Sequence, residues 1–132
     1  MPDINWLAAL AAAVSSFVLG GLWYSPALFG KTWQRAACLT DEQLKNGGQA
    51  RIFGGALVLS IIAAAVFALF LGPDPDVGFA TSAGFSAGLC WVAASFGINY
   101  LFERRNLTLF LVNGGYHTLQ FTLFGLVLGL WH

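Results

Sequence analysis

The sequence predicts an all-α membrane protein whose four transmembrane helices form an up-and-down bundle. Of its 132 residues, 58% are apolar and only 9% are charged. A soluble domain has about 45–50% apolar and about 25% charged residues, so this chain lacks the polar surface that water requires. Its formal net charge is zero and its six basic residues are spread over separate loops, which excludes a continuous basic groove for nucleic acid.

Four uncharged stretches are long enough to cross a hydrocarbon layer of about 30 Å. Lipid cannot satisfy free backbone groups, so each stretch is predicted to be a helix within one membrane domain over residues 1–132. The first stretch is too long for a typical signal-peptide core, and its flank has Asp3 but no Lys or Arg, so we interpret it as a retained anchor. The predicted spans are residues 4–24, 52–71, 77–102 and 107–131.

The positions of the basic residues predict the orientation. All six lie between spans one and two or between spans three and four, whereas Asp3, Asp74 and Asp76 flank the other ends. The positive-inside rule then places the two basic loops in the cytoplasm and both termini outside a cell membrane, the inner membrane in a bacterium. The basic residues are Lys31, Arg35, Lys45, Arg51, Arg104 and Arg105.

Each connection has its own turn chemistry. The segments GPDPD (residues 72–76) and ERRN (residues 103–106) are short turns, which predicts tight hairpins. In the longer first loop, Thr40 and Gln43 fit a capping box that starts a cytoplasmic helix, and the NGG of residues 46–48 can break that helix. Cys38 in this loop and Cys90 in span three are poorly placed to pair, so both are predicted to be free thiols.

A short amphipathic helix is predicted over residues 26–37, after the first span. Ser25 can cap it and Pro26 can take its first position. One face would carry aromatic rings and the other would carry cations, as in a helix that lies on the inner leaflet. Membrane anchoring and a binding lip are the two interpretations of this segment. The residues assigned to this interfacial anchor are Trp23, Tyr24, Phe29, Lys31, Trp33 and Arg35.

An aromatic pair followed by Phe-Gly-Lys and Trp is the most distinctive pattern in the chain. With Asn99, Asn113 and a final apolar helix, it resembles a family of small multi-span membrane proteins named domain of unknown function 1761. This resemblance implies a four-helix membrane protein, and the family has no assigned reaction. The matching positions are Trp23, Tyr24, Phe29, Gly30, Lys31 and Trp33.

Polar residues at membrane depth form the second candidate site. His117 lies about 15 Å from the inner end of span four, and serines of the other three spans reach a similar level. One face of span four carries Asn113, His117 and Gln120, and a stripe of span three carries Gly84, Gly88, Trp91, Ser95 and Asn99. We expect the two faces to meet, with Asn99 near Asn113 and His117 near Ser95 or Trp91. The candidate residues are His117, Asn113, Gln120, Asn99, Ser95, Ser60 and Ser16.

These groups have three interpretations. They can be interhelical hydrogen bonds, each worth about 0.6 kcal/mol in membrane interiors. His117 can instead bind a proton or a ligand. A haem is the third, but the chain has only His117 at this depth and His132 lies at the far terminus, so bis-His ligation would need two subunits. No cofactor and no metal site are predicted. Among the small residues, Gly125 and Gly129 at the outer end are our expected contact for a homo-oligomer.

We expect an integral membrane protein of uncharacterised molecular activity. The first alternative is a small-molecule or proton-linked transporter that uses a polar layer around His117, and the second is an accessory or structural membrane subunit. An enzyme is not expected, because no span contains a carboxylate that could orient His117. The small-molecule ligand of a transporter cannot be named from the residues.

Overall fold

The computed structural model describes residues 4–131, and all regular structure in that range is helical. Asp3 and His132, which enter the predicted orientation and the haem alternative, lie outside the described residues. The elements are α1 (Trp6–Trp23), α2 (Gly30–Ala36), α3 (Asp41–Lys45), α4 (Gln49–Leu71), α5 (Val77–Ala87), the π-helical turn η1 (Gly88–Ala93), α6 (Ala94–Glu103) and α7 (Leu107–Leu130).

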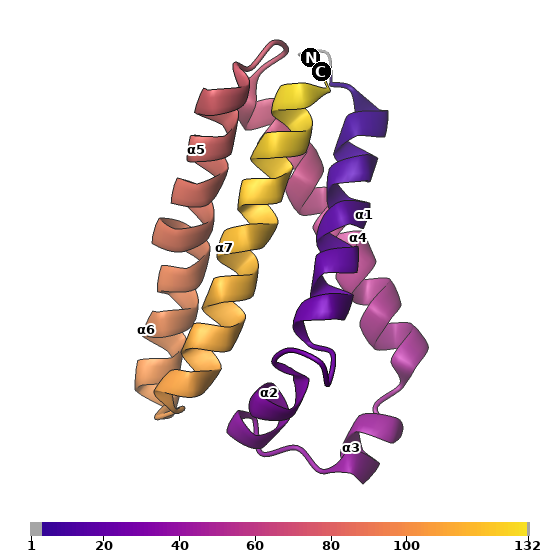
Figure 1. Cartoon of the computed structure of the whole chain (residues 1–132), viewed down its shortest axis with the longest axis vertical. Coiled ribbons are helices and arrows are strands. Elements are labelled where there is room, and N and C mark those ends of the chain that lie inside the picture. The colour runs from indigo at the N-terminus through magenta and orange to yellow at the C-terminus, as the bar shows by residue number, and fades with distance from the viewer. Residues whose placement is uncertain (1–3, 132) are drawn as a thin grey trace.

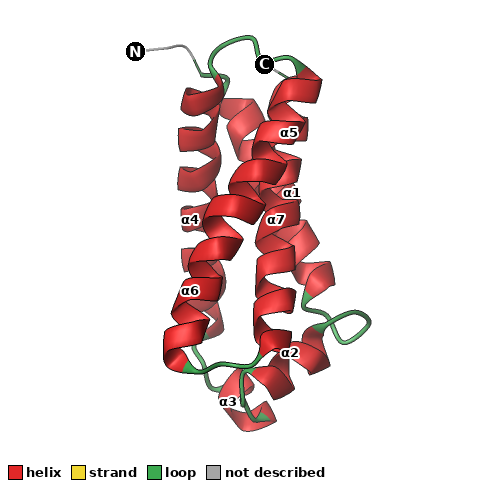
Figure 2. Cartoon of the chain, turned by 90° about the vertical axis from the view of Figure 1, so that its left-hand side faces the viewer, coloured by secondary structure: helices red, strands yellow, loops and turns green. Residues whose placement is uncertain are grey.

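Helix α7 lies at the centre of the arrangement. It packs along α5, η1 and α6 on one side and along α1 on the other, and it also contacts α4 and α2. Helix α4 crosses behind α1 and diverges from it toward α3 (Figure 1). The loop between α4 and α5 lies at the end of the molecule where the described chain starts and stops, and α2, α3 and the α6–α7 turn lie at the opposite end (Figure 2).

Helices occupy all four predicted spans, and their ends fall within three residues of the predicted ends. Within the described chain, three helices are long and apolar enough to cross a membrane, namely α1, α4 and the continuous helix Val77–Glu103. Helix α7 has 24 residues and no charged side chain, but its central polar residues lower its mean hydropathy. A four-span bundle therefore goes beyond what length and composition alone establish.

The interior of the protein is built from small residues and its surface from large apolar ones. Of the 15 buried hydrophobic residues, ten are alanine, and Phe124 is the largest side chain that is fully buried. Large side chains such as Leu59, Phe70 and Leu101 are 68%, 66% and 80% exposed. Small residues let helix backbones approach closely, and a large apolar exterior fits lipid better than water.

Four glycines lie in the contact that α5 and η1 make with α7. A Cβ atom at Gly84 would overlap the carbonyl oxygen of Phe121, and one at Gly88 would lie 2.8 Å from the carbonyl oxygen of His117. On α7, a Cβ at Gly125 would overlap the backbone of α5, and one at Gly129 would lie 2.7 Å from Val77 Cα. The predicted oligomer contact at Gly125 and Gly129 is therefore wrong, because both glycines are buried inside one chain.

The third predicted span contains a π-helical turn, η1, that the sequence pattern does not predict. Such a turn widens the helix by one residue, because its hydrogen bonds run from i to i+5. The residues of this helix that contact α7 therefore include Gly84 and Gly88, four residues apart, and then Ala93, five residues further on, and Gly97. Trp91, Ser95 and Asn99, which an uninterrupted α-helix would place in line with Gly84 and Gly88, are exposed.

The first loop contains two short helices. The capping box is confirmed, since Thr40 Oγ1 accepts from the Gln43 amide at 3.1 Å and Gln43 Oε1 accepts from the Thr40 amide at 2.8 Å. Helix α3 ends at Lys45, and Gly48, with φ of 71°, separates it from α4, as the NGG segment indicated. Both cysteines are free, as predicted.

The amphipathic helix starts four residues later than predicted. Ser25 does not cap it, because its hydroxyl donates to the Leu22 carbonyl at 2.7 Å. Residues 26–29 form turns, and the Gly30 amide donates to the Ser25 carbonyl at 2.9 Å. This turn places the rings of Phe29 and Trp23 in contact, with centroids 4.6 Å apart, before α2 begins.

Candidate functional site

Gln120 joins three helices at one level of the molecule. Its Nε2 donates to Ser16 Oγ of α1 and to Ser60 Oγ of α4, each at 3.4 Å. Gln120, Ser16 and Ser60 are 5%, 0% and 8% exposed, so the contact is in the interior. The structure thus brings together candidate residues of α1, α4 and α7, which are far apart in the sequence.

His117 lies beside Gln120 on the same face of α7. Its Nδ1 is 2.7 Å from Gln120 Oε1, and because that oxygen only accepts, Nδ1 donates. In this tautomer Nε2 is an acceptor that Gln120 does not use. The imidazole stacks on Phe96 with centroids 5.0 Å apart, and its other neighbour is the Tyr116 ring at 4.9 Å.

The predicted contact of His117 with Ser95 or Trp91 is wrong. Ser95 is exposed and its hydroxyl donates to the Trp91 carbonyl of its own helix at 2.6 Å. Trp91 is 62% exposed and contacts Phe70 of α4. The extra residue of η1 rotates both side chains off the α7 face and brings Phe96 to His117 instead.

A second polar group lies one turn closer to the basic end of the molecule. Asn113 Nδ2 donates to the Tyr100 hydroxyl at 2.8 Å, and Asn113 Oδ1 accepts from the Tyr24 hydroxyl at 2.6 Å. One amide therefore links α1, α6 and α7. The predicted neighbour Asn99 is exposed, and Tyr100 takes its place for the same reason, the extra residue of η1.

The aromatic residues assigned to the interfacial anchor also pack inside the protein. Trp23 Nε1 donates to the Val112 carbonyl of α7 at 2.9 Å. The Tyr24 ring lies between Trp33 and Tyr116, with centroids 5.6 and 5.5 Å away. Lys31 and Arg35 lie on α2, and both are exposed. The aromatic segment therefore fixes α2 to the junction of α1 and α7.

Tyr116 is a member of this region that the sequence analysis missed. Its hydroxyl donates to the Ser16 carbonyl at 3.0 Å, and its ring contacts both Tyr24 and His117. The signal was helical spacing, since Tyr116 lies three residues after Asn113 and four before Gln120 and so shares their face of α7. It connects the two polar groups into one continuous set.

The buried polar groups of this region are hydrogen-bonded. Within residues 4–131, every buried side-chain nitrogen and oxygen atom has a hydrogen-bond partner. The same residues contain no group of three or more His, Cys, Asp or Glu side chains that could hold a metal ion. Gln120 and the two serines therefore form a contact between helices in which every buried polar atom is hydrogen-bonded.

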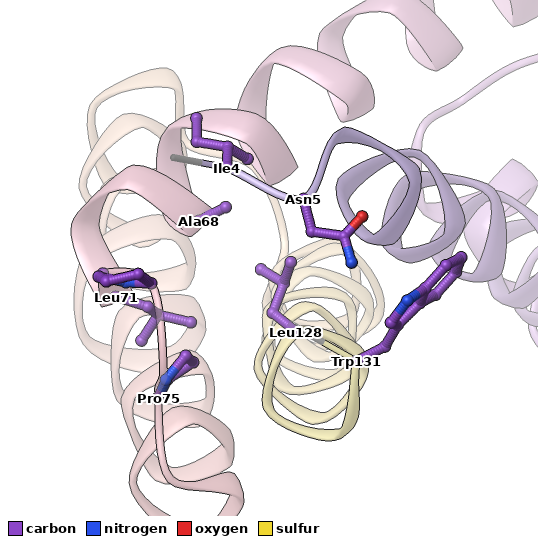
Figure 3. A pocket seen from close by; sticks show the side chains of 9 residues that line it. Ile4, Asn5, Ala68, Leu71, Pro75, Leu128 and Trp131 are labelled. Carbon is purple, nitrogen blue, oxygen red and sulfur yellow. The ribbon is translucent and has the colours of Figure 1, made fainter. Parts of the chain in front are cut away.

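A small cavity lies at the other end of the molecule, between the ends of α1, α4 and α7. Ile4, Asn5, Leu71, Leu128 and Trp131 are among its lining residues (Figure 3). Its volume of about 20 Å³ leaves room for one or two water molecules. The Asn5 side chain beside it caps α1 by accepting from the Ala8 amide at 3.1 Å. This cavity is too small for a substrate.

A helical chain with a bulky apolar exterior, a small-residue interior and a hydrogen-bonded polar layer has the composition of a membrane protein. A family model described as "Protein of unknown function (DUF1761)" matches residues 7–129, nearly the whole chain. The chain therefore belongs to this family, as its aromatic segment indicated. Comparison with curated proteins and with solved structures gives no match.

Proposed function

We propose that the chain is a multi-pass integral membrane protein in which α7 is the fourth span. The observation in favour is the distribution of side chains around α7. Its exposed residues are five leucines and one threonine, whereas Thr118 and Gln120 are buried against the other helices. The polar residues that lower its hydropathy thus face protein, and lipid would meet leucine. The exposed residues are Leu107, Thr108, Leu111, Leu119, Leu126 and Leu130.

We further propose that it works as an accessory or structural membrane subunit. The hydrogen bonding of Gln120 carries this proposal, because one side chain ties α7 to α1 and α4. A transporter needs a path for water or substrate through such a layer, whereas a structural subunit needs the layer closed and fully bonded. Catalysis is not part of the proposal, since Glu103, at the end of α6, is the only carboxylate in the four spans and the hydrogen-bond partner of His117 Nδ1 is Gln120.

A small-molecule or proton-linked transporter is the second candidate. Its support is His117, whose Nε2 is a hydrogen-bond acceptor and whose ring is half-buried between Phe96 and Tyr116. A polar ligand with a donor group would fit that nitrogen. A self-assembled homo-oligomer is compatible with either role, through the exposed apolar faces.

Access of water to Ser60 separates the two functions. In a Cys38→Ser, Cys90→Ser background, Ser60→Cys is treated in native membranes with a small hydrophilic thiol reagent. A closed layer leaves this thiol unmodified from either side. Asp74→Cys, in an exposed loop, is the positive control. Rapid modification at position 60 in a variant with unchanged thermal stability would contradict the structural role and support transport.

A further inference from the structure

A groove of about 350 Å³ lies where α6 meets α7 at the basic end of the molecule. Its walls include Gly97, Leu101, Leu107 and Phe110, and Arg105 also lines it. Leu101 and Leu107 are 80% and 69% exposed, so the groove opens on the apolar surface of the protein. Neither the polar layer nor the small cavity at the other end includes these residues.

The backbone of the hairpin fixes Arg105 at this edge. The Arg105 amide donates to the Tyr100 carbonyl at 2.9 Å and the Arg104 amide to the Leu101 carbonyl at 3.4 Å, which together close the end of α6. Arg104 takes the left-handed conformation, with φ of 59°, where glycine is the usual residue. The turn thus carries two cations at the cost of a backbone conformation that arginine disfavours.

The charge of this end of the molecule is positive. All six basic residues lie there with three acidic ones, Asp41, Glu42 and Glu103, which gives a formal charge of 6 − 3 = +3. The hairpin itself has two arginines and one glutamate, or 2 − 1 = +1. An anion is therefore the ligand that complements the polar edge of the groove.

Tyr100 supplies a second polar contact on the groove wall. Its hydroxyl oxygen accepts from Asn113 Nδ2 at 2.8 Å, so its own proton can be donated elsewhere. Arg105 has a guanidinium and Tyr100 has a phenol, and both residues line the groove together with exposed leucines and a phenylalanine. This combination matches a molecule that has oxygen acceptors at one end and hydrocarbon at the other.

We propose that this groove binds one anionic phospholipid, with its phosphate at Arg105 and Tyr100 and an acyl chain along Leu101, Leu107 and Phe110. The proposal rests on the membrane placement proposed above. Arginine suits phosphate because its planar guanidinium presents paired donors to two oxygens. The apolar part of the groove would add affinity through van der Waals packing against the acyl chain, because lipid tails are as apolar as leucine and hydrophobic transfer contributes little within a bilayer.

Native mass spectrometry of the detergent-purified full chain tests this site. The probes are dioleoylphosphatidylglycerol and dioleoylphosphatidylcholine, which have the same acyl chains and differ in net charge. We expect the anionic lipid to bind more tightly, and Arg105→Gln to reduce that preference about tenfold, as for loss of a charge-assisted hydrogen bond. Arg51→Gln, at the same end but outside the groove, is the matched control and should keep the preference.

A second variant tests the apolar wall. Leu107→Ser should weaken both lipids to a similar extent and leave their ratio unchanged. Equal loss with Arg51→Gln and Arg105→Gln would show attraction by diffuse charge and overturn the site. Equal binding of the two lipids by the unaltered protein would also overturn the site. Displacement of the lipid by glycerol phosphate at equal concentration would overturn it as well, because the acyl chain would then contribute nothing to binding.

Thermal unfolding of each variant without added lipid controls for folding. Extraction of membranes at alkaline pH separates this inference from the proposed function. A chain that alkali releases from membranes would contradict the membrane placement itself. A chain that alkali leaves in the membrane, but that shows no preference for the anionic lipid, would contradict only the phospholipid site.

Discussion

Gly30 is a position in the aromatic segment where the backbone leaves no room for a side chain. A Cβ atom there would overlap the Tyr24 carbonyl oxygen and would lie 2.8 Å from the Ser25 carbonyl. These are backbone atoms of the turn that joins α1 to α2, so they cannot move without opening the turn. Steric need thus accounts for the glycine between Phe29 and Lys31.

Gly30→Ala is therefore expected to destabilise the protein by about 1–3 kcal/mol, the cost of forcing extra atoms into a packed site. Gly21→Ala is the matched control, because a Cβ at Gly21 meets no atom within 4 Å. Gly21 lies inside α1, where alanine favours the helix by up to about 1 kcal/mol. Thermal unfolding in detergent should lower Tm for the first variant only. Equal changes in both would contradict the steric account.

Gln120 is the residue on which the polar layer depends most. Gln120→Leu removes two donated bonds to serine hydroxyls and the acceptor of His117 Nδ1, so we expect a loss of about 1–2 kcal/mol of stability. Ser95→Ala, on the exposed face, should cost close to nothing. The measurement is again thermal unfolding in detergent. A Gln120→Leu protein at least as stable as the unaltered one would contradict the bridging role.

At the scale of single elements, η1 decides which residues of the third span meet α7. An insertion of one residue into a regular helix produces such a turn, so removal of one residue should restore a regular α-helix. Both flanking segments would keep their faces toward α7, with Gly84 and Gly88 before the deletion and Gly97 after it. We therefore predict that the protein still folds when one residue of η1 is deleted, whereas the same deletion in a regular helix prevents folding.

Deletion of Cys90, which is exposed in η1, is expected to give a folded protein with Tm within a few degrees of the original. Deletion of Leu119, an exposed residue in the regular helix α7, should prevent folding, because it rotates everything after it by about 100°. Circular dichroism and gel filtration in detergent would distinguish the outcomes. Similar loss of fold in both deletions would show that η1 does not compensate.

The same turn marks the limit of what the sequence predicts. Charge-free length and turn residues located the four helical stretches, and Thr40 with Gln43 located a cap, because each signal is local. Helical spacing also placed His117 and Gln120 on one face of α7. The α-helical period predicts the wrong neighbours across the helix interface, Ser95 and Asn99, because the backbone of residues 88–93 is π-helical.

The glycine contacts show a second limit. Pairs of glycines four residues apart predict close packing of helices, and such packing is present between α5 and α7. The pattern does not say which helix is the partner, so a contact inside the chain and a contact between chains have the same sequence signal. The pattern therefore predicts the wrong partner for Gly125 and Gly129, which pack against α5.

At the scale of the whole molecule, the helical arrangement and the charge distribution support the same topology. Every basic residue lies at the end that carries α2, α3 and the α6–α7 turn, and Asp74 and Asp76 lie at the other end. By the positive-inside rule, the basic end is predicted to be cytoplasmic. A three-span alternative, with α7 outside the bilayer, would instead leave the end of α7 on the cytoplasmic side.

Single cysteines in the Cys38→Ser, Cys90→Ser background distinguish these topologies. The sites are Asp74, Gln49 and Trp131, which follows the last residue of α7, and all three are exposed. The reagent is an impermeant maleimide applied to intact cells. Four spans with outside termini predict labelling of Asp74→Cys and Trp131→Cys before lysis and of Gln49→Cys only after it. Labelling of Asp74→Cys alone would indicate three spans. Labelling of Gln49→Cys alone would show the opposite orientation, in which the basic end faces outward.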